Sequence, residues 1–342
     1  MTATNHSANQ GRVPAQGVPA QQMPTTAPAA PVQGAPVPAQ AAYAQAPAAA
    51  QAAYAQGAPV PAQQGQVLQA PHGQVPAQQR ASRRRVQAKQ TFFSVFRSEW
   101  SKLASLRSTW ITAAIASLIT IGISVGIMAQ YVGTKGYADK AANYLTVGSS
   151  FGQIAVAVLG ALLITGEYSS GQIRSSLAAV PRRGRLFAAK ALVVAIFSAL
   201  LGLVTVTLTY LLSLPILGDK AGSLSNPEYL GFFWGTAMAF AIIGLMAMSF
   251  GYILRSTAGS ISLVVVLLFV LLIPLGLAAS KWEWVQYITD VLPSSSAAAV
   301  ADPYHLLGAI TKLDHGAVIA SGYAWAIIPM IIAYVVFSKR DA

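Results

Sequence analysis

Apolar residues gather in six long stretches between residues 110 and 338, separated by short polar segments. An α-helix rises about 1.5 Å per residue, so about 20 apolar residues cross a hydrocarbon layer about 30 Å thick. The six stretches meet this length and cover residues 110–132, 146–165, 186–214, 231–254, 258–279 and 317–338. The pattern predicts an all-α, polytopic membrane protein with six transmembrane helices.

The basic residues are distributed unevenly between the two sides of these helices. Of the 22 Lys and Arg residues, 17 lie on the side of the N-terminus. Basic residues collect on the cytoplasmic side of membrane proteins, so we expect both termini in the cytoplasm and the chain in the cell membrane. The net charge of +12 then faces anionic lipid head groups rather than nucleic acid. Only 9% of the residues are charged, against about 25% in soluble domains, which argues against a soluble protein.

Residues 1–88 differ in composition, being rich in Ala, Gln and Pro, with Arg12 as the only charge before residue 80. Short repeats occur in it, since QAAYAQ stands at 40–45 and again at 51–56. Frequent prolines and the shortage of large apolar residues predict a disordered cytoplasmic tail. A role as a proline-rich ligand or tether is the alternative. Residues 89–342 form the second predicted domain, which contains the six transmembrane helices.

Large apolar side chains recur at helical spacing just before the first span. They are Phe92, Phe96, Trp100, Leu103, Leu106 and Trp110. With basic residues on its other faces, this segment is typical of an interfacial helix that contacts membrane lipids. Glu99 and Arg107 interrupt the apolar side, and Glu99 is expected to pair with Lys102 one turn later. A simple membrane anchor and a contact with a partner protein both remain open.

The spans carry no Asp, Glu or His in their middle. Lys190 and Arg255 stand at span ends, where we expect them to extend towards water. Ion-coupled transporters place ionisable groups along their pathway, so an apolar or amphipathic substrate and a separate energy source are favoured. The phosphate-binding pattern GxxxxGK[ST] is missing, which indicates that this chain does not hydrolyse ATP by itself.

The connection between the second and third spans contains the most distinctive polar segment, GEYSSGQIRSSLAAVPRRGRLFAAK, at 166–190. Ile173, Leu177 and Val180 follow at i, i+4 and i+7, and Pro181 stops a helix there. We predict a short amphipathic helix over 171–180. A basic inner loop that only follows the charge rule is the alternative.

Three segments resemble a known family: FRSEWSKLASLRSTW at 96–110, the connection from 164 to 192, and LPSSSAAAV at 292–300. Over about residues 90–340 the chain is similar to the permease subunit of an ATP-binding-cassette (ABC) transporter of the type-2 exporter class. The resemblance implies that the inner loop forms a coupling helix that docks on a separate ABC ATPase, which binds the ATP. A second permease subunit, identical or a paralogue, is also implied, and no cofactor or nucleic acid.

The candidate coupling residues, on this resemblance, are Glu167, Ile173, Arg174, Leu177, Val180, Arg182 and Arg183. We expect the apolar side chains of the coupling helix to bury themselves against the ATPase.

The last outer connection offers weak candidates for other chemistry. Asp302, His305, Asp314 and His315 are potential metal ligands, but Pro303 suits a helix start better than a ligand platform. Ser294 follows Pro293 and is expected to cap a helix, since no base that would activate it is recognisable. We therefore predict no metal and no catalytic residue. A membrane enzyme working at this loop, or a structural or regulatory membrane protein, is the rival interpretation.

Overall fold

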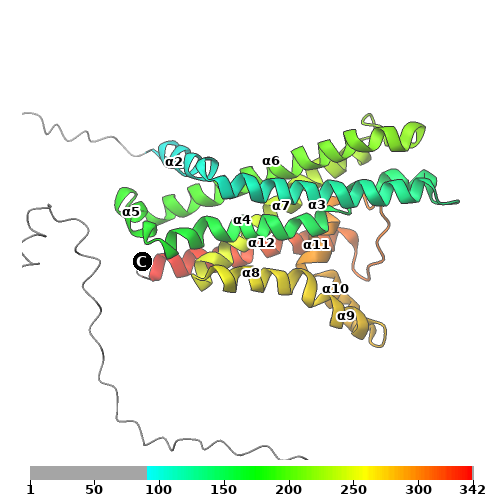
Figure 1. The fold of residues 1–342 in the computed structure, drawn as a ribbon. Coiled ribbons are helices and arrows are strands. Elements are labelled where there is room, and N and C mark those ends of the chain that lie inside the picture. Colours follow the sequence, from blue (N-terminus) through cyan, green and yellow to red (C-terminus); the bar gives the residue numbers. More distant parts are fainter. Residues whose placement is uncertain (1–90, 341–342) are drawn as a thin grey trace, which may run out of the picture. The chain divides into compact units, whose positions relative to one another are not determined.

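The computed structural model describes residues 91–340, and all regular elements in this part are helical. Six helices are long and apolar enough to cross a membrane: Arg107–Val132, Ala138–Ser169, Arg183–Lys220, Pro227–Leu254, Thr257–Ala279 and His315–Lys339. The predicted all-α architecture with six spanning helices is therefore confirmed (Figure 1). The predicted tail, residues 1–88, lies outside the described residues, so its disorder stays a prediction.

The helices keep their labels from Figure 1 below. They are α2 (Phe92–Ser105), α3 (Arg107–Val132), α4 (Ser149–Ser169), α5 (Gln172–Ala179), α6 (Arg183–Leu217), α7 (Pro227–Leu254), α8 (Thr257–Val265), α9 (Leu272–Ala279), α10 (Glu283–Asp290), α11 (Pro293–Ala301) and α12 (His315–Lys339). Two 3-10 helices, Ala138–Thr146 and Gly218–Lys220, precede α4 and follow α6. A π-helical turn, Val266–Val270, joins α8 and α9 into the fifth span.

Helix α7 is the central helix of the bundle. In its most apolar stretch 72% of the residues are buried, against 11% in the fifth span. Glycines bring α4 and α7 together, because a Cβ atom on Gly160 would lie 2.3 Å from the carbonyl oxygen of Gly244. Small residues at helix crossings allow such close packing in membranes. The core therefore forms around α7, and the fifth span lies at the periphery.

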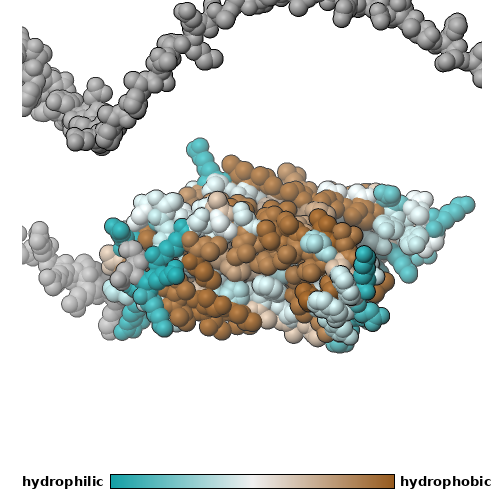
Figure 2. All heavy atoms as spheres, turned by 90° about the horizontal axis from the view of Figure 1, so that it is seen from below, coloured by the Kyte–Doolittle hydropathy of each residue, from teal (hydrophilic) through white to brown (hydrophobic). Residues whose placement is uncertain are grey.

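The surface of the bundle is apolar across its middle and hydrophilic at its two ends (Figure 2). Large apolar side chains such as Leu118, Ile273 and Leu277 point outwards from the spans. A soluble protein rarely exposes apolar patches of this extent, whereas lipid covers them without cost. The surface agrees with a multi-pass membrane protein.

Polar segments far apart in the sequence meet at one end of the bundle. Helices α2 and α5 lie there together with the C-terminal end of α12, while α9 and α10 lie at the opposite end (Figure 1).

The last connection, predicted as an outer loop, folds into α10 and α11. Helix α11 packs against α7 and α12, with Ser296, Ala297 and Val300 fully or almost fully buried.

Candidate functional site

The predicted interfacial helix is divided in two at Leu106. Helix α2 ends at Ser105, Leu106 is extended with φ −80° and ψ 121°, and α3 begins at Arg107. The indole Nε1 of Trp110 donates to the carbonyl oxygen of Ala104 at 2.8 Å, an oxygen that a continuous helix would use for its own ladder. The expectation of one apolar stripe from residue 92 to 110 is therefore wrong after Leu103.

Helix α2 packs on the bundle through its remaining apolar side. Leu103 is almost fully buried, and the Trp100 ring meets the Phe197 ring of α6 edge-on at 6.3 Å between centroids. Phe96 packs partly against the same cluster, whereas Phe92 is exposed. Contact between α2 and a lipid surface stays a prediction.

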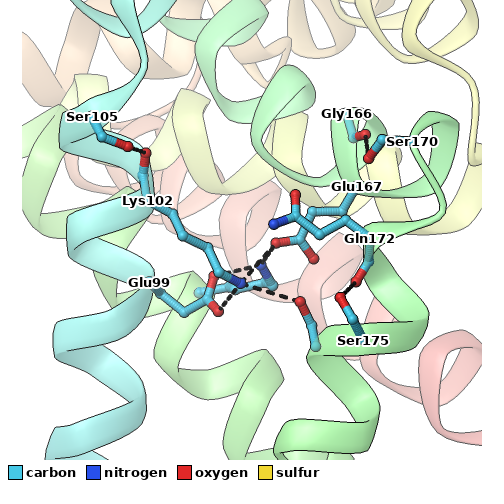
Figure 3. Close-up of polar contacts among 10 residues, drawn as sticks. Glu99, Lys102, Ser105, Gly166, Glu167, Ser170, Gln172 and Ser175 are labelled. Carbon is cyan, nitrogen blue, oxygen red and sulfur yellow. Dashed lines mark hydrogen bonds and ion pairs between the residues drawn. The ribbon is translucent and has the colours of Figure 1, made fainter.

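Four charged side chains form a buried network between α2, α4 and α6, here called the ion quartet: Glu99, Lys102, Glu167 and Lys190 (Figure 3). The Lys190 ammonium lies 2.5 Å from Glu99 Oε2 and 2.6 Å from Glu167 Oε1. Lys102 lies 2.7 Å from Glu99 Oε1 and 3.3 Å from Glu167 Oε1. The predicted Glu99–Lys102 pair is confirmed, and it forms part of the ion quartet.

The ion quartet is electrically neutral, with two carboxylates for two ammonium groups. Lys190 is fully buried, so the expectation that it extends to water is wrong. The carboxylates of its partners take the place of water around its ammonium group. Burial by itself lowers the pKa of Lys102, but the hydrogen bonds and charges of Glu99 and Glu167 outweigh it and hold that pKa above its ordinary value. Contacts between opposite charges therefore hold the quartet together.

The predicted amphipathic helix is present as α5. Gly171 precedes it with a left-handed φ of 70°, which glycine adopts readily, and Val180 ends it before Pro181. Ser176 of α5 accepts a hydrogen bond from the Lys102 ammonium at 3.1 Å. Helix α5 is thereby connected to α2 and to the ion quartet.

The apolar side of α5 faces its own chain. Ile173 is only 3% exposed and belongs to a core cluster with Val95 and Leu186, against which Leu177 and Val180 also pack. The expectation that the ATPase buries these side chains is therefore wrong for Ile173, which the permease already covers. It stays a prediction for Leu177 and Val180, which are partly exposed. The exposed side of α5 carries Arg174 among polar and small residues.

The three candidate arginines occupy different surroundings. Arg174 and Arg182 are exposed. Arg183 donates through Nη1 to the carbonyl oxygens of Phe337, Ser338 and Arg340, at 3.2, 3.1 and 2.8 Å. These carbonyls end α12, where a helix has unpaired acceptors and partial negative charge. Arg183 is therefore an anchor for the last span.

The outer-loop candidates hold the loop together. Both carboxylate oxygens of Asp302 accept backbone amides, from Leu306 at 2.9 Å and Leu307 at 2.8 Å. The His305 and His315 rings stack in parallel at 4.4 Å. In the described part of the chain no group of three or more His, Asp or Glu is placed to hold a metal ion.

The sequence model of the ABC-2 family transporter proteins matches residues 95–274, from the first turn of α2 to α9. This chain belongs to the ABC-2 transporter family. The match includes all four residues of the ion quartet and the whole of α5, so the site lies in the family domain of an ABC-2 type permease. A search of curated proteins finds no match.

Proposed function

We propose that this ABC-2 permease exports an apolar or amphipathic substrate, using ATP that a separate ABC ATPase subunit binds and hydrolyses at the α5 end. The chain then acts as a transport subunit rather than as an enzyme. It works with a second permease subunit in the cell membrane, with both termini in the cytoplasm. The excess of basic residues on the α2 and α5 side supports this orientation.

The observation that carries the proposal is the direct connection of α5 to the spans. Lys102 bonds Ser176 of α5, Glu99 of its own helix and Glu167 at the end of α4, and Glu167 in turn binds Lys190 of α6. A force applied to α5 therefore reaches α2 through a hydrogen bond, and α4 and α6 through the ionic contacts of the quartet. Such a connection suits a helix that receives movement from another subunit.

The exposed side of α5 is the surface offered to the ATPase. Arg174 lies on it, and Arg182 follows directly before α6. Positive side chains in these places favour an acidic docking surface on the ATPase. Glu167 stands four residues before the left-handed Gly171, so we propose it as the residue that transmits the movement of α5 to α4.

The substrate class rests on the spans. The described spans have no Asp, Glu or His in their middle, and the ion quartet is neutral and confined to one end. An ion crossing such a bundle would meet no compensating charge.

The test is co-purification of the permease from its native membrane with an ABC ATPase subunit. Arg174→Glu with Arg182→Glu reverses two exposed charges and should weaken the association about tenfold or more, because like charges then face each other. The matched control is Lys281→Glu at the opposite end, which should leave the association unchanged. Wild-type association in the double variant would exclude α5 as the docking surface. Failure of the ATPase to associate with the unaltered permease would refute the proposed function itself.

A further inference from the structure

Two histidine rings lie against each other at the end of the bundle opposite α5. His305 belongs to the connection between α11 and α12, and His315 is the first residue of α12, whose last turn lies beside α5 (Figure 1). The planes of the two rings are parallel within 1°, and their centroids are 4.4 Å apart. Both side chains are partly exposed, so protons from water can reach them. The two rings therefore form a titratable contact far from the ion quartet.

Each ring also makes one hydrogen bond to the backbone. His305 donates through Nε2 to the carbonyl oxygen of Ala309 at 2.8 Å, and His315 donates through Nε2 to the carbonyl oxygen of Asp302 at 2.9 Å. A carbonyl oxygen only accepts, so the proton of each neutral ring is on Nε2. A further proton is added at Nδ1 and leaves both bonds in place. Proton uptake therefore changes the charge of the two rings, while their hydrogen bonds can persist.

The two rings hold the middle of the connection, residues 303–311. Its ends are held by carboxylates, since Asp302 accepts two backbone amides near the start and Asp290 accepts two near the end. Between these ends Ile310 is 94% exposed. His305 has a left-handed φ of 59°, which a residue with a side chain adopts only when its surroundings impose it. The conformation of this segment therefore depends on the contacts of the two rings.

The connection covers part of the bundle end. The Tyr304 ring packs so closely on Gly231 of α7 that a Cβ atom on this glycine would lie 2.6 Å from it. The carbonyl oxygen of Leu306 accepts a hydrogen bond at 2.9 Å from Asn143, in the 3-10 helix before α4. Movement of residues 303–311 would therefore alter contacts with α7 and with the first connection on this side.

Charge decides whether the rings stay together. Two imidazolium ions at 4.4 Å repel each other, whereas one imidazolium ion beside a neutral ring meets no like charge in its partner. Asp302 and Asp314 stand beside the rings, but their oxygens accept backbone amides. The other charged groups on the surrounding elements are Glu283 and Asp290 of α10, Glu228 of α7, Asp139 and Lys140 of the 3-10 helix, and Lys312. In the described part of the chain none of these carboxylates hydrogen-bonds either ring.

We propose that His305 and His315 form a proton-operated latch on the connection between α11 and α12. With one charge or none, the stacked rings keep the connection closed over the start of α7. With two charges the rings separate, and residues 303–311 move away from α7. The signal is the acidity of the solution at this end of the bundle. The latch goes beyond the proposed function and does not rest on it, since it needs neither ATP nor an ATPase.

The experiment measures the position of the connection at two pH values. The chain has no cysteine, so Ile310→Cys on the connection and Ser225→Cys between α6 and α7 each carry one spin label. Pulsed electron paramagnetic resonance on the purified full-length chain gives the distance between the labels at about pH 7.5 and at about pH 5, within the range where histidine takes up protons. The distance distribution should be narrow at the higher pH, and should shift and broaden at the lower pH. An unchanged distribution would overturn the proposal.

Glutamine at either position removes the charge and keeps an N–H donor. His305→Gln and His315→Gln, each added to the labelled chain, leave at most one charge on the latch, so each should keep the narrow distribution at both pH values. The matched control is His72→Gln, which removes a histidine outside the connection and should respond to pH like the labelled chain with all its histidines. A pH response that persists in both latch variants would assign the response to other groups and refute the latch.

The two glutamine variants also separate the charge of the rings from their contact. If one variant shows the broad distribution already at the higher pH, the other decides, because loss of either charge is sufficient to remove the repulsion. A narrow distribution at both pH values in at least one variant supports the latch. Broad distributions in both variants at the higher pH would show that ring contact alone holds the connection, and would overturn the role of charge.

Discussion

Replacement of Lys190 by Met tests the importance of the ion quartet for stability. Methionine keeps an unbranched apolar side chain in the same space but removes the ammonium group that lies 2.5 Å from Glu99 and 2.6 Å from Glu167. Lys102 alone then balances two buried carboxylates. Removal of one partner from a buried ion pair costs about 3 to 5 kcal/mol, because a buried charge is left uncompensated.

The assay is thermal unfolding of the detergent-solubilised protein. For a domain of this size each kcal/mol shifts the midpoint by roughly 2 to 4 °C, so Lys190→Met should lower it by roughly 6 to 20 °C. Lys281→Met is the control, since the same exchange at an exposed position should change the midpoint little. Glu167→Gln combined with Lys190→Met restores neutrality and should recover much of the loss. A midpoint for Lys190→Met within about 2 °C of the wild type would refute this account of the quartet.

Three further outcomes are expected. Trp110→Phe keeps a ring but loses the bond to Ala104, so the free energy of unfolding should fall by about 1 kcal/mol in the same assay. An unchanged midpoint would show that this bond does not stabilise the α2–α3 break. Single cysteines at Ser338 and at Lys281 should differ in reaction with an impermeant thiol reagent on intact cells, with labelling at Lys281 alone; labelling at Ser338 alone would invert the topology. Deletion of residues 2–79 should leave membrane insertion and co-purification with the ATPase intact, and loss of either would assign the tail a part in assembly.

The spans and α5 were predictable because their signals are local. Hydropathy over about 20 residues determines where a span lies, and Gly171 and Pro181 delimit α5 within ten residues. Conformation at such positions depends on a few neighbours in the chain. The resemblance to the family was likewise found in short segments, two of which include α2 and α5, and the family model matches residues 95–274.

The ion quartet could not be predicted as a unit, because its members stand up to 91 residues apart in the sequence. A visible signal did exist: Lys190 lies at the start of a long apolar run, and Glu99 lies on an apolar helix face. Each residue alone suggested local solutions, a lysine reaching water and a carboxylate paired one turn later. The shared solution appears only when α2, α4 and α6 are packed together.

The same limit explains the error over Ile173 on the apolar side of α5. Spacing shows that Ile173, Leu177 and Val180 share a face, but it does not show whether the partner of that face belongs to the same chain. The break at Leu106 is accompanied by an indole bond from Trp110 to Ala104, which periodicity cannot reveal.

The guanidinium of Arg183 has a practical consequence for spectroscopy. It holds the last carbonyls of α12, so the end of α12 is attached to the first residue of α6, directly after the segment that joins α5 to α6. A spin label at Ser338 will therefore report movements of that segment, although it lies 155 residues away in the sequence. Together with a second label on α2, it allows a distance to be measured across the α5 end of the bundle. Turnover of ATP by an associated subunit can then be followed as a change in the distance between the two labels, while α5 itself stays unlabelled.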